Sequence, residues 1–572
     1  MKKKLLMAFG ALGLGVAFAA VPNNTLLIMS SSDIPTMDPA QAYDTASSEP
    51  LENVYESLIA YKGKSITQNE PALATDWKIS TDGKKYTFNL RKNVKFHTGN
   101  AFTCEDAEYS FERVLVTNNS DSPAWFISSA LLGFAYWDDD AKAKIGYAQI
   151  DKAVECNNGA LVLTLAGKDP AFLSKLLYTA TSIIDKKHAV SIGEWSGTAT
   201  DFKAFLEKDL NDSELNKKPS GTGAYQVVSR DANKAVFKAF AGYWGTKATI
   251  DNIIIQKVDE AATRILALQK GDADFVGVGS RANLKQVEGV AGVKVIDGLP
   301  SNSNTAIFLN QNIKDPKVLG SGKLDGKGIP FNFFTDINVR KGFSYAFDSK
   351  KYIDEVLLGK GKQLTMALIE SYLGYDKTIP LYNYNPERAT KLLKAAWGGQ
   401  LWANGFQIDM NYRANSITSQ KALEILKANL EKLNPKFKLN LSAKPWSELL
   451  KDADTSKLPM VLGGWLPDYP DSDNILRTFY HSTDSAFKGR LNFNDKQIDQ
   501  LIEQAYSTTD NAKRAALYRL VGRRAYDLQP FINLPQAVGY MTIRDNIKGV
   551  EENYNQMISG SFGVYWKDLS KQ

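Results

Sequence analysis

The residues with the most evident chemical potential lie in one short stretch, GGWLPDYPDSDN, at residues 463–474. It places three aspartates, Asp468, Asp471 and Asp473, just after Trp465, with no Lys or Arg among them. Carboxylates beside an aromatic side chain could ligate a metal, transfer protons or pair with a cationic ligand group. Asp471 and Asp473 stand just before the helical pattern NILRTFY, where Asp favours capping a helix. For Asp468 the residues alone favour a turn-forming role in this Pro-rich loop over a ligand contact.

Metal and covalent chemistry find little support elsewhere in the chain. The three histidines, His97, His188 and His481, are scattered, and the aspartate stretch lacks the Gly and the later Glu of a calcium loop. No G-x-S-x-G, H-E-x-x-H or P-loop occurs, and GVGSRA at 277–282 imitates a dinucleotide fingerprint without a convincing acidic partner. We expect no catalytic residues, no metal and no cofactor; His481, near the aspartate stretch, stays open as a ligand contact.

The first residues indicate export. MKKK is a basic segment, LLMAFGALGLGVAF is an apolar one that is short for a membrane span, and AFA at 17–19 fits a cleavage site, so we predict a mature chain from Ala20. An uncleaved anchor is the alternative. No Cys follows the apolar segment, which argues against a lipoprotein. Removal of three lysines lowers the net charge from +6 to +3, which gives no sign of nucleic-acid binding.

The two cysteines of the chain, Cys104 and Cys156, both lie in the predicted mature part. In an oxidising compartment an isolated pair of this kind predicts one disulfide bond. Two buried free thiols are the alternative, because the sequence does not give the distance between them.

The patterning predicts several domains. Strands alternate with helices at about 185–300 and again from 301, and a hairpin-rich section with turns at Asp82-Gly83 and Asn158-Gly159 lies before them. Near the N-terminus, apolar positions from Leu51 to Ile59 have helical spacing after Pro50. We therefore expect two α/β lobes with an accessory domain and a ligand site in a cleft between domains.

Several motifs, in order, resemble the extracellular solute-binding proteins of the peptide ABC-transporter class (family 5). They are ALATDWKISTDGKKYTFNLRKNVKFHTGNAFTCEDAEYSFERV, PSGTGAYQVV, AGYWGTKATIDNIIIQKVDEAATRILALQKGDADFV, VRKGFSYAFDSKKYIDEVLLGKG, NPERATKLLKAA and GGWLPDYPDSDN. The resemblance covers nearly the whole mature chain and is greatest to the periplasmic dipeptide- and oligopeptide-binding proteins.

The resemblance implies an α/β fold of the periplasmic-binding-protein type II, a Venus flytrap with an extra accessory domain as in cluster C. Residues 1–19 would be the signal peptide, 63–184 the accessory domain and 301–529 the second lobe. The first lobe would combine residues 23–62, 185–300 and 530–572.

The same resemblance implies a function without chemistry. A periplasmic monomer would capture short peptides in the cleft between its lobes and deliver them to a membrane ABC permease complex. The alternative is the same fold with an oligosaccharide, an opine or another non-peptide solute, which stacked aromatics would favour.

Two charged residues would then anchor the ends of a peptide. Asp468 matches the position that holds the peptide α-amino group in this family, the alternative being an aspartate that only forms a turn. Arg413 ends a predicted strand and would bind the peptide carboxylate through its two-pronged guanidinium; a surface arginine is the alternative.

Neighbouring residues would shape the site. Trp465 would form an apolar wall or pack in the core, and Gly464 would let the ligand approach the strand closely or mark a bulge. Tyr43, Trp446 and Asn304 are weaker contact candidates, for which ordinary packing is the alternative.

Overall fold

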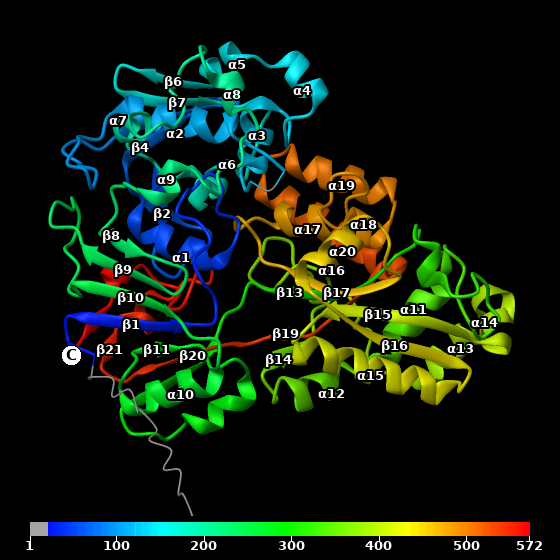
Figure 1. Cartoon of the computed structure of the whole chain (residues 1–572). Helices are drawn as coiled ribbons and strands as arrows, with labels where there is room; N and C mark the ends of the chain where they lie inside the picture. Colours follow the sequence, from blue (N-terminus) through cyan, green and yellow to red (C-terminus); the bar gives the residue numbers. More distant parts are fainter. Residues whose placement is uncertain (1–20, 121) are drawn as a thin grey trace, which may run out of the picture.

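The computed structural model describes residues 21–120 and 122–572 (Figure 1). The predicted signal peptide at 1–19 and the predicted mature N-terminus at Ala20 lie outside the described residues. Two mixed α/β bodies lie side by side, and a third body, cyan in Figure 1, is packed above the first. The predicted α/β class is confirmed. No helix in the described ranges is long and apolar enough to cross a membrane.

The first body contains a mixed sheet of seven strands in the described part of the chain. Its central strand β1 is apolar along nearly its whole length and runs parallel to β10 and β11, which is typical of a strand covered on both faces. In spatial order the strands are β12 (Val293–Leu299), β20 (Gly539–Arg544), β11 (Phe275–Val276), β1 (Thr25–Ser30), β10 (Asn252–Lys257), β9 (Lys234–Ala239) and β8 (Tyr225–Arg230).

The second body contains a sheet of five strands among the described residues. In spatial order they are β16 (Phe437–Lys444), β15 (Phe406–Arg413), β17 (Met460–Trp465), β13 (Asn304–Leu309) and β18 (Phe531–Asn533). β18 pairs with β13 through Phe531 and Ile532, both buried, and so completes this sheet. The chain thus returns to the first body only after Asn533, whereas the sequence placed the start of that return at residue 530.

Two short segments, 300–303 and 534–538, connect the bodies. They follow β12 and β18, and the second contains β19 (Gln536–Ala537), which pairs with β14 (Gly361–Lys362). The Gln536 amide donates hydrogen bonds to the carbonyls of Ser301 (2.8 Å) and Ser303 (3.3 Å), so the two connections are joined to each other. A motion of one body relative to the other has to bend both segments together.

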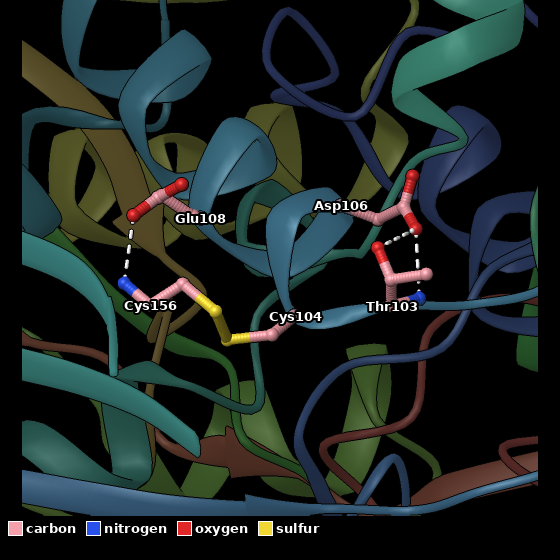
Figure 2. The surroundings of a disulfide bond; sticks show 5 residues. All are labelled: Thr103, Cys104, Asp106, Glu108 and Cys156. Atoms are coloured by element: carbon pink, nitrogen blue, oxygen red, sulfur yellow. Dashed lines mark hydrogen bonds between the residues drawn. A yellow bond between two sulfur atoms is a disulfide. The ribbon is translucent and has the colours of Figure 1, made fainter. Parts of the chain in front are cut away.

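The third body is built on the antiparallel sheet β4 (Ala74–Ile79), β5 (Lys85–Leu90), β7 (Ala160–Thr164) and β6 (Val154–Asn157). The predicted hairpin turns are present: Gly83 has φ of 71°, and Asn158 and Gly159 have φ of 52° and 78°. Figure 2 shows Cys104, at the start of α2 (Cys104–Val116), joined to Cys156 on β6 by a disulfide with an S–S distance of 2.08 Å. The bond therefore fastens α2 to the sheet.

Helices cover the sheets. The first body has α1 (Thr45–Val54), α9 (Glu214–Lys217), α10 (Ala261–Lys270) and α21 (Val550–Asn553). The third has α2, α3 (Trp125–Leu132), α4 (Asp139–Lys144), α5 (Tyr147–Ala153), α6 (Phe172–Lys175), α7 (Lys186–Ser191) and α8 (Phe202–Phe205). The second has α11 (Ile337–Ala346), α12 (Ser349–Lys351), α13 (Pro386–Ala395), α14 (Gln400–Asn404), α15 (Ile417–Leu433), α16 (Trp446–Asp454), α17 (Ser472–Tyr480), α18 (Lys488–Leu491), α19 (Lys496–Tyr506) and α20 (Asn511–Leu528).

Helix α1 differs from the sequence prediction at both ends. It begins at Thr45, ahead of Pro50, because the Asp44 carboxylate accepts a hydrogen bond from the Ser47 N–H and caps the first turn. It ends at Val54, and Ile59 belongs instead to the short strand β2 (Ile59–Tyr61), which pairs with β3 (Asn69–Pro71). The helix is therefore placed so that its first turns approach the boundary between the bodies.

Candidate functional site

A cavity of about 1080 Å³ lies where the three bodies meet. The first body contributes α1 and the 554–563 segment, the third contributes the region of Trp125 and Tyr178, and the second contributes α16, α17 and the 464–469 loop. Pro300, Ser301 and Asn302 of the first connecting segment also line it. A ligand in this cavity would touch all three bodies, as expected of a site between domains.

Asp468 is placed in this cavity by the loop that follows β17. It is only 7% exposed, and its carboxylate accepts hydrogen bonds from the Tyr43 hydroxyl and the Asn474 amide, both at 3.3 Å. Tyr43, which also lines the cavity, is held in turn by the Trp125 indole N–H at 2.9 Å. These contacts join a carboxylate of the second body to the first and the third.

The electrostatics of Asp468 suit a cationic ligand. Burial raises the pKa of Asp468 to about 7, against the opposing effect of the hydrogen bonds from Asn474 and Tyr43. No cationic side chain of the described residues forms an ion pair with it. A ligand ammonium group would supply that missing partner and favour the ionised carboxylate.

The other two aspartates of the stretch act inside the protein, as predicted. Asp471 caps α17 by accepting a hydrogen bond from the Asp473 N–H, and it pairs with Arg514 at 2.7 Å. Asp473 is buried in the first turn of α17 and pairs with Arg477. The three aspartates lie within six residues of one another, yet Asp468 faces the cavity while Asp471 and Asp473 form contacts inside the protein.

Trp465 and Gly464 line the cavity, and Asn304 does not. The Trp465 indole N–H donates to Asn474 at 2.7 Å, so Asn474 fixes both Trp465 and Asp468. A Cβ on Gly464 would lie 2.5 Å from the Asn304 carbonyl oxygen, so strand pairing itself requires glycine there. Asn304 is buried behind this wall, where its amide donates to the Ala367 carbonyl.

Arg413 is exposed at the end of β15 and is not among the cavity-lining residues. Its guanidinium lies 5.4 Å from the ring centre of Trp446, which does line the cavity and is 42% exposed. Of these two predicted ligand contacts, Trp446 lines the cavity and Arg413 does not.

Two other arginines, Arg477 and Arg490, line the cavity. Arg490 packs its guanidinium 4.5 Å from the ring centre of Phe487 and pairs with Asp454 at 2.7 Å. Arg477 pairs with Asp473, Asp484 and Glu503. The sequence reading missed both arginines because each lies inside a helix after the aspartate stretch, with no local motif around it.

Two glutamates of α1, Glu49 and Glu52, also line the cavity and were not singled out from the sequence. Burial raises the pKa of Glu49 to about 7 and that of Glu52 to about 8. Glu49 accepts hydrogen bonds from Ser561 and Trp566, and Glu52 accepts from the Ser559 N–H. The available signal was their spacing of three residues, which places them on one face of a helix.

Metal binding has no support in the described ranges, where no group of three or more His, Cys, Asp or Glu side chains is arranged to hold an ion. His481 is buried outside the cavity lining, where its ring lies 3.2 Å from Glu503.

Comparisons with known proteins agree with this architecture. The chain is 27% identical over 540 residues to heme-binding protein A of Haemophilus influenzae (92% of this chain, 90% of that protein). It is 26% identical over 551 residues to the dipeptide-binding protein of Escherichia coli (93% and 92%). Its fold matches the periplasmic binding protein DppA of Helicobacter pylori in complex with the peptide STSA, with a TM-score of 0.74, 23% identity and coverage of 96% and 98%.

The sequence profile of the bacterial extracellular solute-binding proteins, family 5 Middle, matches residues 68–487. This range includes the third body, the aspartate stretch and most of the cavity wall contributed by the second body. The chain belongs to the family 5 bacterial extracellular solute-binding proteins.

Proposed function

We propose that the protein captures short peptides in the cavity between its bodies and delivers them to a membrane ABC permease, without doing chemistry on them. The observation that carries this proposal is the buried carboxylate of Asp468, which faces a cavity of about 1080 Å³ and has no cationic partner among the described residues. Under this proposal, the α-ammonium group of a peptide is that partner.

Relatives support peptides as the ligand class. The Escherichia coli relative is named a dipeptide-binding protein, and the Helicobacter pylori structure holds the peptide STSA. Buried, unpaired carboxylates also suit an ammonium group better than a neutral sugar, because a sugar leaves the carboxylate charge uncompensated. The proposal includes export by the leader at 1–19, release as a soluble periplasmic monomer rather than a lipoprotein, and no binding of nucleic acid.

For the peptide carboxylate we propose Arg490 as the partner. Unlike Arg413, it lines the cavity, and its contact with Phe487 orients the guanidinium. A bidentate interaction with a carboxylate requires an oriented guanidinium.

Calorimetric titration with trialanine tests the ammonium site. We expect Asp468→Asn to weaken binding about 100-fold, because a buried ammonium would lose its counter-ion while the shape of the site is kept. Asp139→Asn, a change at an exposed position of α4 outside the cavity, is the matched control and should bind as the wild type does. Equal affinities of wild type and Asp468→Asn would contradict the assignment.

Trialanine and its C-terminal amide test the carboxylate partner in the same way. We expect the wild type and Arg413→Ala to prefer the free acid, and Arg490→Gln to lose that preference. Loss of the preference in Arg413→Ala would instead assign the carboxylate to Arg413.

A further inference from the structure

A second cavity of about 500 Å³ lies behind α1, between the first and third bodies. Four residues line both cavities: Glu52, Tyr61, Leu177 and Ile558. They form a wall shared by the two cavities, so the second cavity lies directly behind this part of the main one.

Carboxyl groups outnumber cations in the described lining of the second cavity. Four acidic side chains line this cavity: Glu52, Glu56, Glu70 and Asp568. Among the described residues, the one cation in the lining is Lys567, which pairs with Asp568 at 2.9 Å. Glu56 accepts hydrogen bonds from Thr222, Tyr243 and Trp244 at 2.8–2.9 Å, all from neutral groups. Neither Glu52 nor Glu56 has an ion-pair partner within 4 Å among the described residues.

Aromatic side chains provide the rest of the wall. Tyr61, Tyr243, Trp244 and Tyr565 line the second cavity, and aromatic faces attract cations. The structure contains one such contact already: the Arg91 guanidinium, which does not line the cavity, lies 4.0 Å from the ring centre of Trp244. Carboxylates and aromatic rings together form the kind of environment that binds an ammonium or guanidinium group.

A further lining residue is also unsatisfied. Thr179 is 4% exposed, and its hydroxyl oxygen has no hydrogen-bond partner among the described residues. A buried hydroxyl without a partner costs free energy. The oxygen itself has almost no exposed surface, so a polar group in the cavity reaches it only if the Thr179 side chain rotates.

The two cavities lie close enough for one ligand to reach both. The partly buried ring of Tyr178 lines the main cavity. Burial is the largest cause of the raised pKa of its hydroxyl, and the charges of Asp468 and Glu52 raise it further. The ring of Tyr178 also packs edge-on against Tyr43, the hydrogen-bond partner of Asp468, with ring centres 6.3 Å apart. One tyrosine thus lies between the ammonium site and the entrance to the second cavity.

We propose that the second cavity receives a basic side chain, lysine or arginine, of a peptide whose α-ammonium group pairs with Asp468, and that Glu52 stands at its entrance and Glu56 inside it. This inference rests on the proposed function and adds a preference for basic peptides. It assigns no role to the neutral side chains of other peptides.

Calorimetry with lysine and norleucine peptides tests the inference. Trialanine is compared with tripeptides that carry lysine, or its neutral analogue norleucine, at position one, two or three. We expect one position to bind at least about tenfold more tightly with lysine than with norleucine, as for a cation gaining a desolvated carboxylate partner. Norleucine keeps the length and the apolar stem, so the ratio of the two Kd values reports the charge.

Three variants locate the effect. Glu52→Gln and Glu56→Gln should each bring the ratio close to one, and Glu288→Gln, at an exposed position outside both cavities, should keep it. Circular dichroism melting of each variant verifies that it is folded. A ratio near one in the wild type at every position would overturn the proposal. So would a ratio that survives Glu56→Gln, because the side chain would then stop outside the second cavity.

Failure of the proposed function gives a different result. In that case trialanine and all the substituted peptides fail to bind the wild type. Failure of the side-pocket inference leaves trialanine binding intact and abolishes only the advantage of lysine.

Discussion

At the residue scale, the site is marked by carboxylates that are buried but lack cations. Burial raises the pKa of Asp468 and of Glu49 to about 7 and that of Glu52 to about 8. A carboxylate in this condition is costly to ionise, and the cost is recovered when a cation is bound. The free energy of ligand binding should therefore depend on pH in the neutral range.

We predict that trialanine binds more weakly as the pH falls from 7.5 to 6. Only the ionised form of Asp468 pairs with an ammonium group, so below a pKa of about 7 each pH unit should cost up to about tenfold in affinity. Calorimetry in buffers of different ionisation enthalpy measures both the affinity and the protons released. The peptide α-amino group itself titrates near 8, which sets the upper limit of the useful range.

Asp468→Asn supplies the control for this prediction. Its remaining affinity should vary less with pH than that of the wild type. The stability of the unliganded protein changes with pH in the opposite direction. Because the pKa of Asp468 is raised, the folded state binds the proton more tightly than the unfolded state does, so the free energy of unfolding falls as the pH rises from about 4 through about 7. Without ligand, Asp468→Asn should therefore melt above the wild type at pH 8. A wild-type affinity that is flat across pH 6 to 7.5 contradicts the pairing.

At the element scale, patterns of a few neighbouring residues predicted some turns and helices. They did not predict whether a given side chain faces a cavity. The turns at Asp82-Gly83 and Asn158-Gly159 follow from backbone preferences that depend on a few neighbours. The direction of Arg413 depends on Trp446 of another element, and the exposure of Glu52 to a cavity depends on the 554–563 segment. Contacts of this kind join distant parts of the chain and leave no local pattern.

The family resemblance identified a residue of the cavity only where that residue lies inside a short local motif. Asp468 was predicted because Trp465, the strand and the loop lie together in the sequence. Asn474, which holds both residues, lies in the same stretch, but its role is visible only once α17 folds back over the loop. The residues of α1 were predicted to be helical without any indication that the helix borders a ligand cavity.

The disulfide between α2 and β6 supports a prediction on the third body. Replacing both cysteines, Cys104→Ser with Cys156→Ser, should lower its stability by about 4 kcal/mol, from the loop entropy of a cross-link spanning 52 residues. Guanidinium unfolding followed by circular dichroism measures this loss, and reduced wild type should match the variant. Neither cysteine lines a cavity, so trialanine affinity at 25 °C should be unchanged. An unfolding midpoint equal to that of the oxidised wild type contradicts the prediction.

At the scale of the whole molecule, the third body touches the second beside the ammonium site. Tyr469, next to Asp468, packs against Phe126 of α3 with ring centres 5.3 Å apart. Lys175 of α6 lies 5.1 Å from the ring centre of Tyr469 and 5.4 Å from that of Tyr506, while pairing with Asp169 at 2.7 Å. These contacts cross the boundary between the third and second bodies, as the hydrogen bond from Tyr43 to Asp468 crosses the boundary between the first and second.

The consequence is that the binding-competent arrangement should depend on residues that never touch the ligand. Tyr506 on α19 does not line the main cavity, yet it lies against Lys175 of the opposite body. We predict that Tyr506→Leu weakens trialanine binding severalfold, because the apparent affinity falls with the fraction of molecules in the arrangement that binds. Small-angle scattering should show a larger radius of gyration without ligand and a return toward the wild-type value at saturation. Tyr384→Leu, an exposed change within the second body, is the control, and unchanged scattering and affinity in Tyr506→Leu would show that this contact does not hold the bodies together.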